Sequence, residues 1–61
     1  MESNILHYYA TKRDLWQVFD IVGRLVRQGT VEVGGNLIDL EGLPPGIYIF
    51  RCQKESRKIF R

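Results

Sequence analysis

The 61-residue chain has only one cysteine, one histidine and two prolines. The single cysteine, Cys52, excludes an internal disulfide, and Cys52 with His7 cannot supply the four ligands of a structural zinc site. A domain of this size buries roughly 60% of the surface of its unfolded chain, so its core is small and lacks these common supports. We expect Cys52 to be a buried, apolar-like side chain rather than a reactive thiol.

Long hydrophobic segments are also missing. No apolar run approaches the length of a membrane span, and the first residues have neither the basic start nor the hydrophobic stretch of a signal peptide. If the protein is exported, we expect the export signal to lie elsewhere. Internal repeats and low-complexity segments are absent, so residues 1–61 are expected to form a single domain.

The residue patterns of an enzyme are not found. The seven acidic residues are scattered, with no acid–base pair recognisable by spacing. His7 lies between Leu6 and Tyr8 in a predicted strand, where a satisfied structural histidine is expected. The sequence therefore predicts no enzyme, no cofactor and no metal.

Basic residues gather near the end of the sequence, although the net charge is only +2. Residues 51–61 contain a single acidic residue, Glu55, and five basic ones: Arg51, Lys54, Arg57, Lys58 and Arg61. Charge alone favours a solvated strand face that resists mispairing. A binding surface for anions or a partner is the alternative.

Short runs of β-branched and aromatic residues alternate with turn residues along the chain. The predicted strands are 4–10, 14–20, 25–27, 30–33, 36–40, 46–52 and 56–60, with breaks at Gly29 and at Gly34-Gly35. A helix through 14–27 is disfavoured because Gly23 interrupts it and β-branched residues are frequent. Seven short antiparallel strands predict an all-β fold, a small sandwich or barrel.

Strand 14–20 should bury Trp16 and Val18 on one face and partly cover Leu15 and Phe19 on the other. Likewise Ile38 and Leu40 share one face of strand 36–40. The remaining aromatics, including Tyr8 and Tyr9, are expected to be core or half-core residues.

Two turns stand out. Residues 20–24 predict a tight hairpin, in which Asp20 opens the turn and Gly23 supplies a left-handed residue. Pro44, Pro45 and Gly46 end the strand before them. Tyr48 follows closely, and a tyrosine there can bury its ring and return its hydroxyl to the backbone at the corner of a sandwich.

These segments occur in an order that resembles a known family. The matching residues are 18–26 (VFDIVGRLV), Gly29-Thr30, 36–40 (NLIDL), 42–49 (GLPPGIYI) and Lys58. Together they cover about residues 14–61 and resemble the C-terminal sorting domain of type IX secretion cargo (Por secretion system). In that family's pattern, eight positions hold the shape: Asp20, Gly23, Arg24, Asn36, Asp39, Pro45, Gly46 and Tyr48.

The resemblance implies a small immunoglobulin-like sandwich at the end of an exported protein of Bacteroidetes-type bacteria. Translocon and shuttle components would recognise it in the periplasm and carry its N-terminal cargo, which is not in this chain, across the outer membrane. A sortase would then remove it and leave the cargo at the cell surface or secreted. The family's opening strand is missing or shortened here, so the cleavage point is expected upstream.

The family's signal is concentrated at its extreme C-terminus, which assigns machinery docking to Lys54, Arg57, Lys58 and Arg61. No nucleic-acid partner is implied. The alternative is a small autonomous β-domain for protein or nucleic-acid binding, whose phosphate contacts would weaken steeply with salt. We also expect the isolated chain to form a homodimer through residues 2–10, because a shortened sandwich exposes an unpaired edge.

Overall fold

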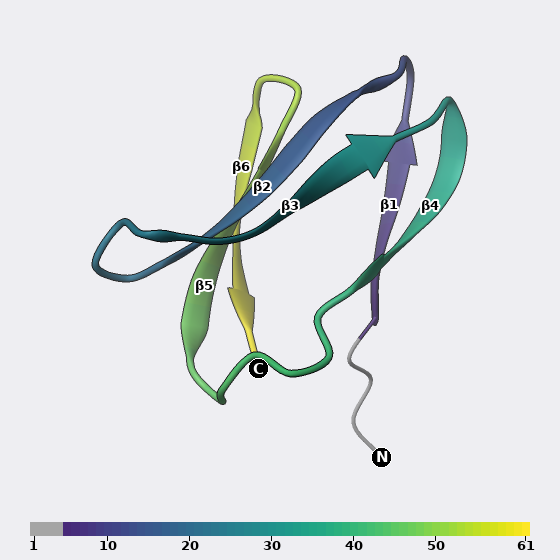
Figure 1. The fold of residues 1–61 in the computed structure, drawn as a ribbon. Helices are drawn as coiled ribbons and strands as arrows, with labels where there is room; N and C mark the ends of the chain where they lie inside the picture. The colour runs from purple at the N-terminus through teal and green to yellow at the C-terminus, as the bar shows by residue number, and fades with distance from the viewer. Residues whose placement is uncertain (1–4) are drawn as a thin grey trace.

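Six antiparallel strands account for most of residues 5–61, the part of the chain that this computed structural model describes (Figure 1). The strands are β1 (Ile5–Ala10), β2 (Asp14–Asp20), β3 (Leu25–Val31), β4 (Gly34–Asp39), β5 (Ile47–Cys52) and β6 (Glu55–Phe60). Within these residues no helix is long and apolar enough to cross a membrane.

The strands form two sheets. One contains β1 and β4, and the other has the order β3-β2-β5-β6. Figure 1 shows the chain passing from one sheet to the other between β3 and β4, and returning through the long loop between β4 and β5. The sheets pack together as a small immunoglobulin-like sandwich, which confirms the predicted fold class.

The core lies between the two sheets. Trp16 and Val18 face inward as predicted, and the ring of Phe50 lies 5.3 Å from that of Tyr8 and 6.3 Å from that of Trp16. The other buried residues are Ala10, Val31, Ile38, Leu40, Leu43, Tyr48, Cys52 and Ile59. The shared face of Ile38 and Leu40 is thus confirmed, and so is the burial of Cys52.

The predicted break at Gly29 is wrong, because β3 runs through this residue without interruption. Gly29 pairs with Trp16 of β2, and a Cβ atom added at Gly29 would lie 2.7 Å from the indole ring. Glycine is needed here for the close approach of a large ring, not for a turn. Two predicted strands, 25–27 and 30–33, are therefore one strand.

The predicted break at Gly34-Gly35 is also displaced, because both glycines belong to β4 and pair with Ala10 and Tyr9. The bend falls instead at residues 32–33. With these two corrections, residues 5–61 contain six strands rather than seven. Strand 14–20 is confirmed in place of the helical alternative. The strands predicted at 46–52 and 56–60 each begin one residue away from the predicted start, whereas β3 ends at residue 31 rather than 33 and β4 spans 34–39 rather than 36–40. Residues 1–4 lie outside the described residues. The start of the predicted strand 4–10 and the expected loss or shortening of the opening strand fall there.

Two side chains on the outward face of β1, Tyr9 and His7, are more exposed than expected. Tyr9 is 74% exposed, because it alternates with Tyr8 along β1 and Tyr8 takes the inward place. His7 is exposed for the same reason and is not a core histidine. Of the outer residues of β2, Phe19 is half-buried as expected, whereas Leu15 is 51% exposed.

Candidate functional site

The turn between β2 and β3 is held by one carboxylate. Oδ1 of Asp20 accepts hydrogen bonds from the backbone N–H groups of Val22 (3.0 Å) and Arg24 (2.9 Å), while Oδ2 accepts from Nε of Arg24 (3.1 Å). Gly23 has the positive φ of 96° that the turn needs. The hydrogen bond from the backbone N–H of Arg24, more than any other contact, holds the pKa of Asp20 below its ordinary value. The predicted hairpin is confirmed, and its three motif residues act within five positions.

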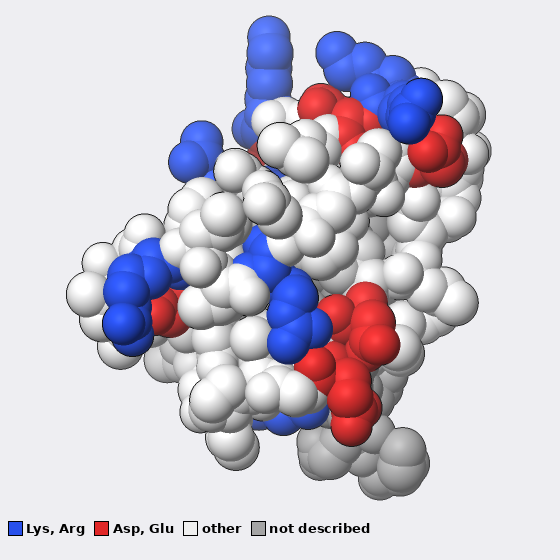
Figure 2. Space-filling model, in the orientation of Figure 1, with Lys and Arg blue, Asp and Glu red and all other residues white. Residues whose placement is uncertain are grey.

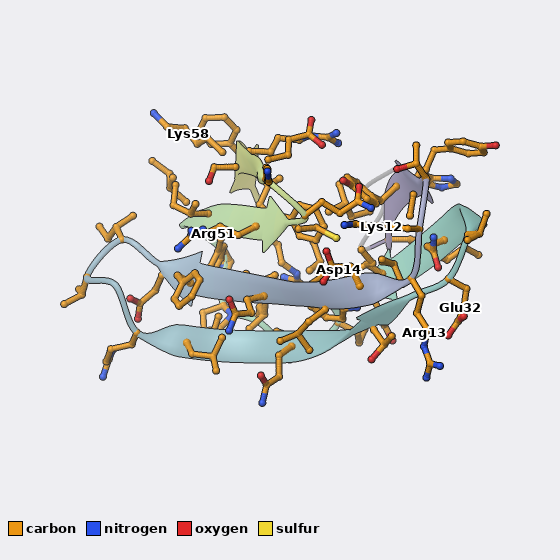
Figure 3. The ribbon with its side chains drawn as sticks, turned by 90° about the horizontal axis from the view of Figure 1, so that it is seen from above. Lys12, Arg13, Asp14, Glu32, Arg51 and Lys58 are labelled. Atoms are coloured by element: carbon orange, nitrogen blue, oxygen red, sulfur yellow. The ribbon has the colours of Figure 1, made fainter. Side chains whose placement is uncertain are left out.

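Asn36 ties the bend between β3 and β4. Its Oδ1 accepts from the backbone N–H of Glu32 at 2.9 Å, and its Nδ2 donates to the carbonyls of Glu32 and Gly34, each at 2.9 Å. Figure 3 shows Arg13 and Glu32 extending toward one another beside this bend, and their charged atoms lie 3.4 Å apart.

Asp39 begins the loop between β4 and β5. Its Oδ1 accepts from the backbone N–H of Glu41 at 2.9 Å. The Asp39 carbonyl lies 3.5 Å from the Arg27 guanidinium of the other sheet. Short polar side chains commonly open turns by bonding to backbone two residues ahead.

Tyr48 closes the same loop as predicted. Its ring is buried, and its hydroxyl donates to the carbonyl of Pro44. The acceptor thus belongs to Pro44 and not to the motif residue Pro45. Gly46 does not adopt positive φ; Gly42 does, at 92°.

Arg61 completes this corner. Its backbone N–H and carbonyl pair with the carbonyl and N–H of Gly46, each at 2.8 Å, and its Nε donates to the Leu40 carbonyl at 2.9 Å. One of the four side chains assigned to docking is thus half-buried and bonded to the loop.

Arg57 also has contacts within the fold. Its guanidinium lies 5.6 Å from the centre of the Tyr8 ring and 3.4 Å from the Glu55 carboxylate. The Tyr8 hydroxyl lies 3.1 Å from acceptors of both Gln53 and Glu55, which links β1 to the β5–β6 turn.

Burial, and then the hydrogen bond to Glu55, raise the pKa of Tyr8 to about 12 from 10.0. The neutral phenol therefore contributes stability that is complete below about pH 10 and is lost as the pH rises toward about 12. Burial also raises the pKa of the Cys52 thiol, which keeps it in its less nucleophilic form.

The four predicted docking residues do not form one patch. Arg57 and Lys58 are neighbours in β6 and so point to opposite faces of the sheet, whereas Lys54 lies in the β5–β6 turn. Arg61 lies at the opposite end of β6, beside Gly46. Figure 2 likewise shows basic side chains in separate groups, several of them beside acidic ones.

The face of the larger sheet that points away from the core carries a shallow groove of about 570 Å³, which we call the outer groove. It is lined by Phe19, Asp20, Ile21, Val22, Gly23, Ile47, Ile49, Arg51 and Lys58. The sequence did not predict this groove, and it placed Arg51 only in the general basic group of residues 51–61. Three alternate residues of β5, Ile47, Ile49 and Arg51, point outward and line it, but only the strand order shows that Lys58 lies beside it.

In a comparison with protein families, the model described as a secretion system C-terminal sorting domain matches residues 4–61. The chain belongs to this family. The resemblance seen in the motifs is thereby confirmed, and the domain is a sorting signal of type IX secretion. Comparison with curated proteins and with solved structures finds no match.

Membership of this family explains why the motif residues hold turns and do not form a reactive centre. Sorting domains are a signal family and not an enzyme family. Within residues 5–61, no group of three or more His, Cys, Asp or Glu side chains is placed to hold a metal ion. A sorting signal acts through the type IX machinery, so its site is an interaction surface.

Proposed function

We propose that this domain docks as a folded unit to the type IX machinery in the periplasm and directs an N-terminal cargo across the outer membrane. Translocon and shuttle components would bind it, and a sortase would then cleave upstream of it and leave the cargo at the cell surface or secreted. The family match over residues 4–61 carries this proposal. The closed turns described above support it, because a rigid shape lowers the entropic penalty of recognition.

The proposal assigns contact with the machinery to the basic residues of the β5–β6 region. Lys54 and Lys58 are exposed and make no ion pair among residues 5–61, so their charges are available to a partner. Arg57 and Arg61 would combine docking with the internal contacts described above. Charged surface groups of this kind mainly raise the rate of association.

The test is delivery of a periplasmic reporter fused to residues 1–61, in a host that carries the type IX pathway. We expect reporter at the cell surface, and none there for the unfused reporter. Deletion of residues 54–61 is a poor test of docking, because it removes β6 and the buried Ile59 and so unfolds the domain. Lys54→Glu changes the charge of an exposed turn residue and should slow delivery without changing the melting temperature.

Two results would contradict the proposal. The first is a fusion that folds but stays in the periplasm. The second is an affinity of the purified chain for nucleic acid that falls steeply with salt, which would favour a phosphate-binding β-domain.

We also propose that the isolated chain self-associates through residues 2–10. Among the described residues, β1 pairs only with β4, in a sheet of two strands. Two-stranded sheets are weak alone, and their edges recruit further strands. Sedimentation at micromolar concentration is expected to show a dimer, and a mass that stays monomeric at every concentration would refute this.

A further inference from the structure

The outer groove is continuous with a larger apolar area at the end of the sheet where β2 turns into β3. Phe19 pairs with Leu25 on one side and with Ile49 on the other, and Ile47 pairs with Phe60. Pairing places these side chains on one face, because opposite residues in antiparallel strands point the same way. Leu25, Phe19 and Ile49 thus form an apolar row across β3, β2 and β5, and Ile47 and Phe60 form a second apolar pair on β5 and β6.

Much of this area is open. The exposed fractions are 75% for Ile21, 76% for Val22 and 72% for Phe60, and Leu25 and Ile47 are 44% and 40% exposed. Single exposed apolar side chains are ordinary on protein surfaces, but a contiguous group marks a place where something binds. The face toward the core already has its partner, the β1–β4 sheet, so this group serves no packing within the domain.

The charges in the groove lining that lack an ion-pair partner among residues 5–61 are all positive. Arg51 and Lys58 line it, and neither forms an ion pair among residues 5–61. Figure 3 shows both side chains extending toward the end of the sheet that carries the β2–β3 turn. The one acidic residue in the lining, Asp20, is already bonded to the turn and to Arg24.

The apolar surface and the unpaired positive charges together indicate which kind of molecule the groove can bind. A second copy of the chain, related by a twofold axis, would bring Arg51 and Lys58 of both copies onto the same apolar surface, where like charges repel. A partner with carboxylates beside apolar side chains would instead match both features. The groove is a hollow that can receive side chains, which favours a protein segment over a flat lipid surface.

We propose that the outer groove docks a segment of a type IX machinery protein that carries both apolar and acidic side chains. Ile47, Ile49 and Phe19 receive the apolar side chains, while Arg51 and Lys58 pair with the carboxylates. This inference rests on the proposed function and names the surface through which it works.

The first experiment compares two double variants of the reporter fusion. The groove variant is Ile47→Ser with Lys58→Glu, and the control is Leu37→Ser with Lys12→Glu, which makes the same kinds of change on the other sheet and in the β1–β2 turn. Leu37 is 70% exposed and lies outside the outer groove. We expect surface delivery to fall roughly tenfold or more for the groove variant and to stay unchanged for the control. Thermal melting of both purified chains checks that neither change unfolds the domain.

Delivery of a folded groove variant at the unsubstituted level overturns this inference alone. If the unsubstituted fusion is not delivered at all, the proposed function fails and the inference fails with it. A groove variant that melts at a much lower temperature is replaced by Arg51→Glu, which changes only an exposed side chain and should reduce delivery equally.

The second experiment identifies the occupant. A photo-crosslinking residue at position 47 is expected to capture a machinery protein in living cells through a peptide that contains Asp or Glu, whereas one at position 37 is not. Adducts between two copies of the chain would overturn the inference. It would also be overturned if the purified chain sediments with phosphatidylglycerol vesicles and Lys58→Glu abolishes this, since the groove would then bind a membrane surface.

Discussion

Two neighbouring connections, the β2–β3 turn within the larger sheet and the β4–β5 loop between the sheets, are stabilised in opposite ways. The turn at residues 20–24 is held by its own Asp20 and Arg24, and its tip projects into solvent. The loop at residues 40–46 lies beside it, because Asp20 pairs with Tyr48, yet it is held by Tyr48 and Arg61 from outside the loop. Its Leu40 and Leu43 are part of the core. The loop at residues 40–46 therefore supports the whole fold, whereas the turn at residues 20–24 can display an exposed binding surface.

The strongest test of this comparison is Tyr48→Ala. It removes a buried ring and the hydroxyl that closes the loop, and should lower the free energy of unfolding by about 3–5 kcal/mol. A 61-residue domain has a total of roughly 3–9 kcal/mol, so most of the fold's stability would be lost. Urea unfolding measures this, and a loss below about 1 kcal/mol would mean that the loop does not support the core.

Tyr48→Phe isolates the hydroxyl, because it keeps the ring. The bond to the Pro44 carbonyl then disappears, and we expect a loss of about 1 kcal/mol in the free energy of unfolding. The same urea titration applies. A neutral result would show that the ring alone holds the corner.

Asp20→Asn should have a smaller effect, confined to the turn, and that effect should depend on pH. The pKa of Asp20 is lower in the fold than its ordinary value of 3.8, so its contribution is present above that pH and is lost as the pH falls through the folded pKa. Melting temperatures of the variant and the unsubstituted chain should therefore converge as the pH is lowered below 3.8 and the folded carboxyl becomes protonated. A constant difference across this range would exclude the charge as its source.

The smallest effect is expected at the tip of the turn. Val22→Ser changes a side chain that is 76% exposed, and the free energy of unfolding should stay within about 0.5 kcal/mol. Thermal melting is sufficient to measure it. A clear destabilisation would mean that the tip packs within the domain and is not a displayed surface.

The same contrast explains what the sequence could predict. The turn at residues 20–24 was correctly predicted because aspartate, glycine and arginine meet within five positions, where local hydrogen bonds decide the conformation. The corner role of Tyr48 was also predicted, since the tyrosine lies four residues from its acceptor. Both depend on short-range geometry.

Features that depend on the pairing of distant strands were missed. Gly29 has the appearance of a turn residue in the sequence, and only its register opposite Trp16 shows that it makes room for a ring. Arg61 was predicted to contact a partner, and its bond to Leu40 could not be inferred across 21 positions. The shared position of Arg51 and Lys58 in the outer groove was also missed, although β5 and β6 are consecutive strands joined by a short turn.

The pairing of Gly46 with Arg61 has a consequence for synthesis. A chain made from its N-terminus can form the β2–β3 turn as soon as residue 24 is available, but residues 40–46 cannot be fixed until residue 61 has been added. Ile59 reaches the core in the same last strand. A nascent or clipped chain that stops short of residue 61 therefore lacks the hydrogen bonds that close the β4–β5 loop.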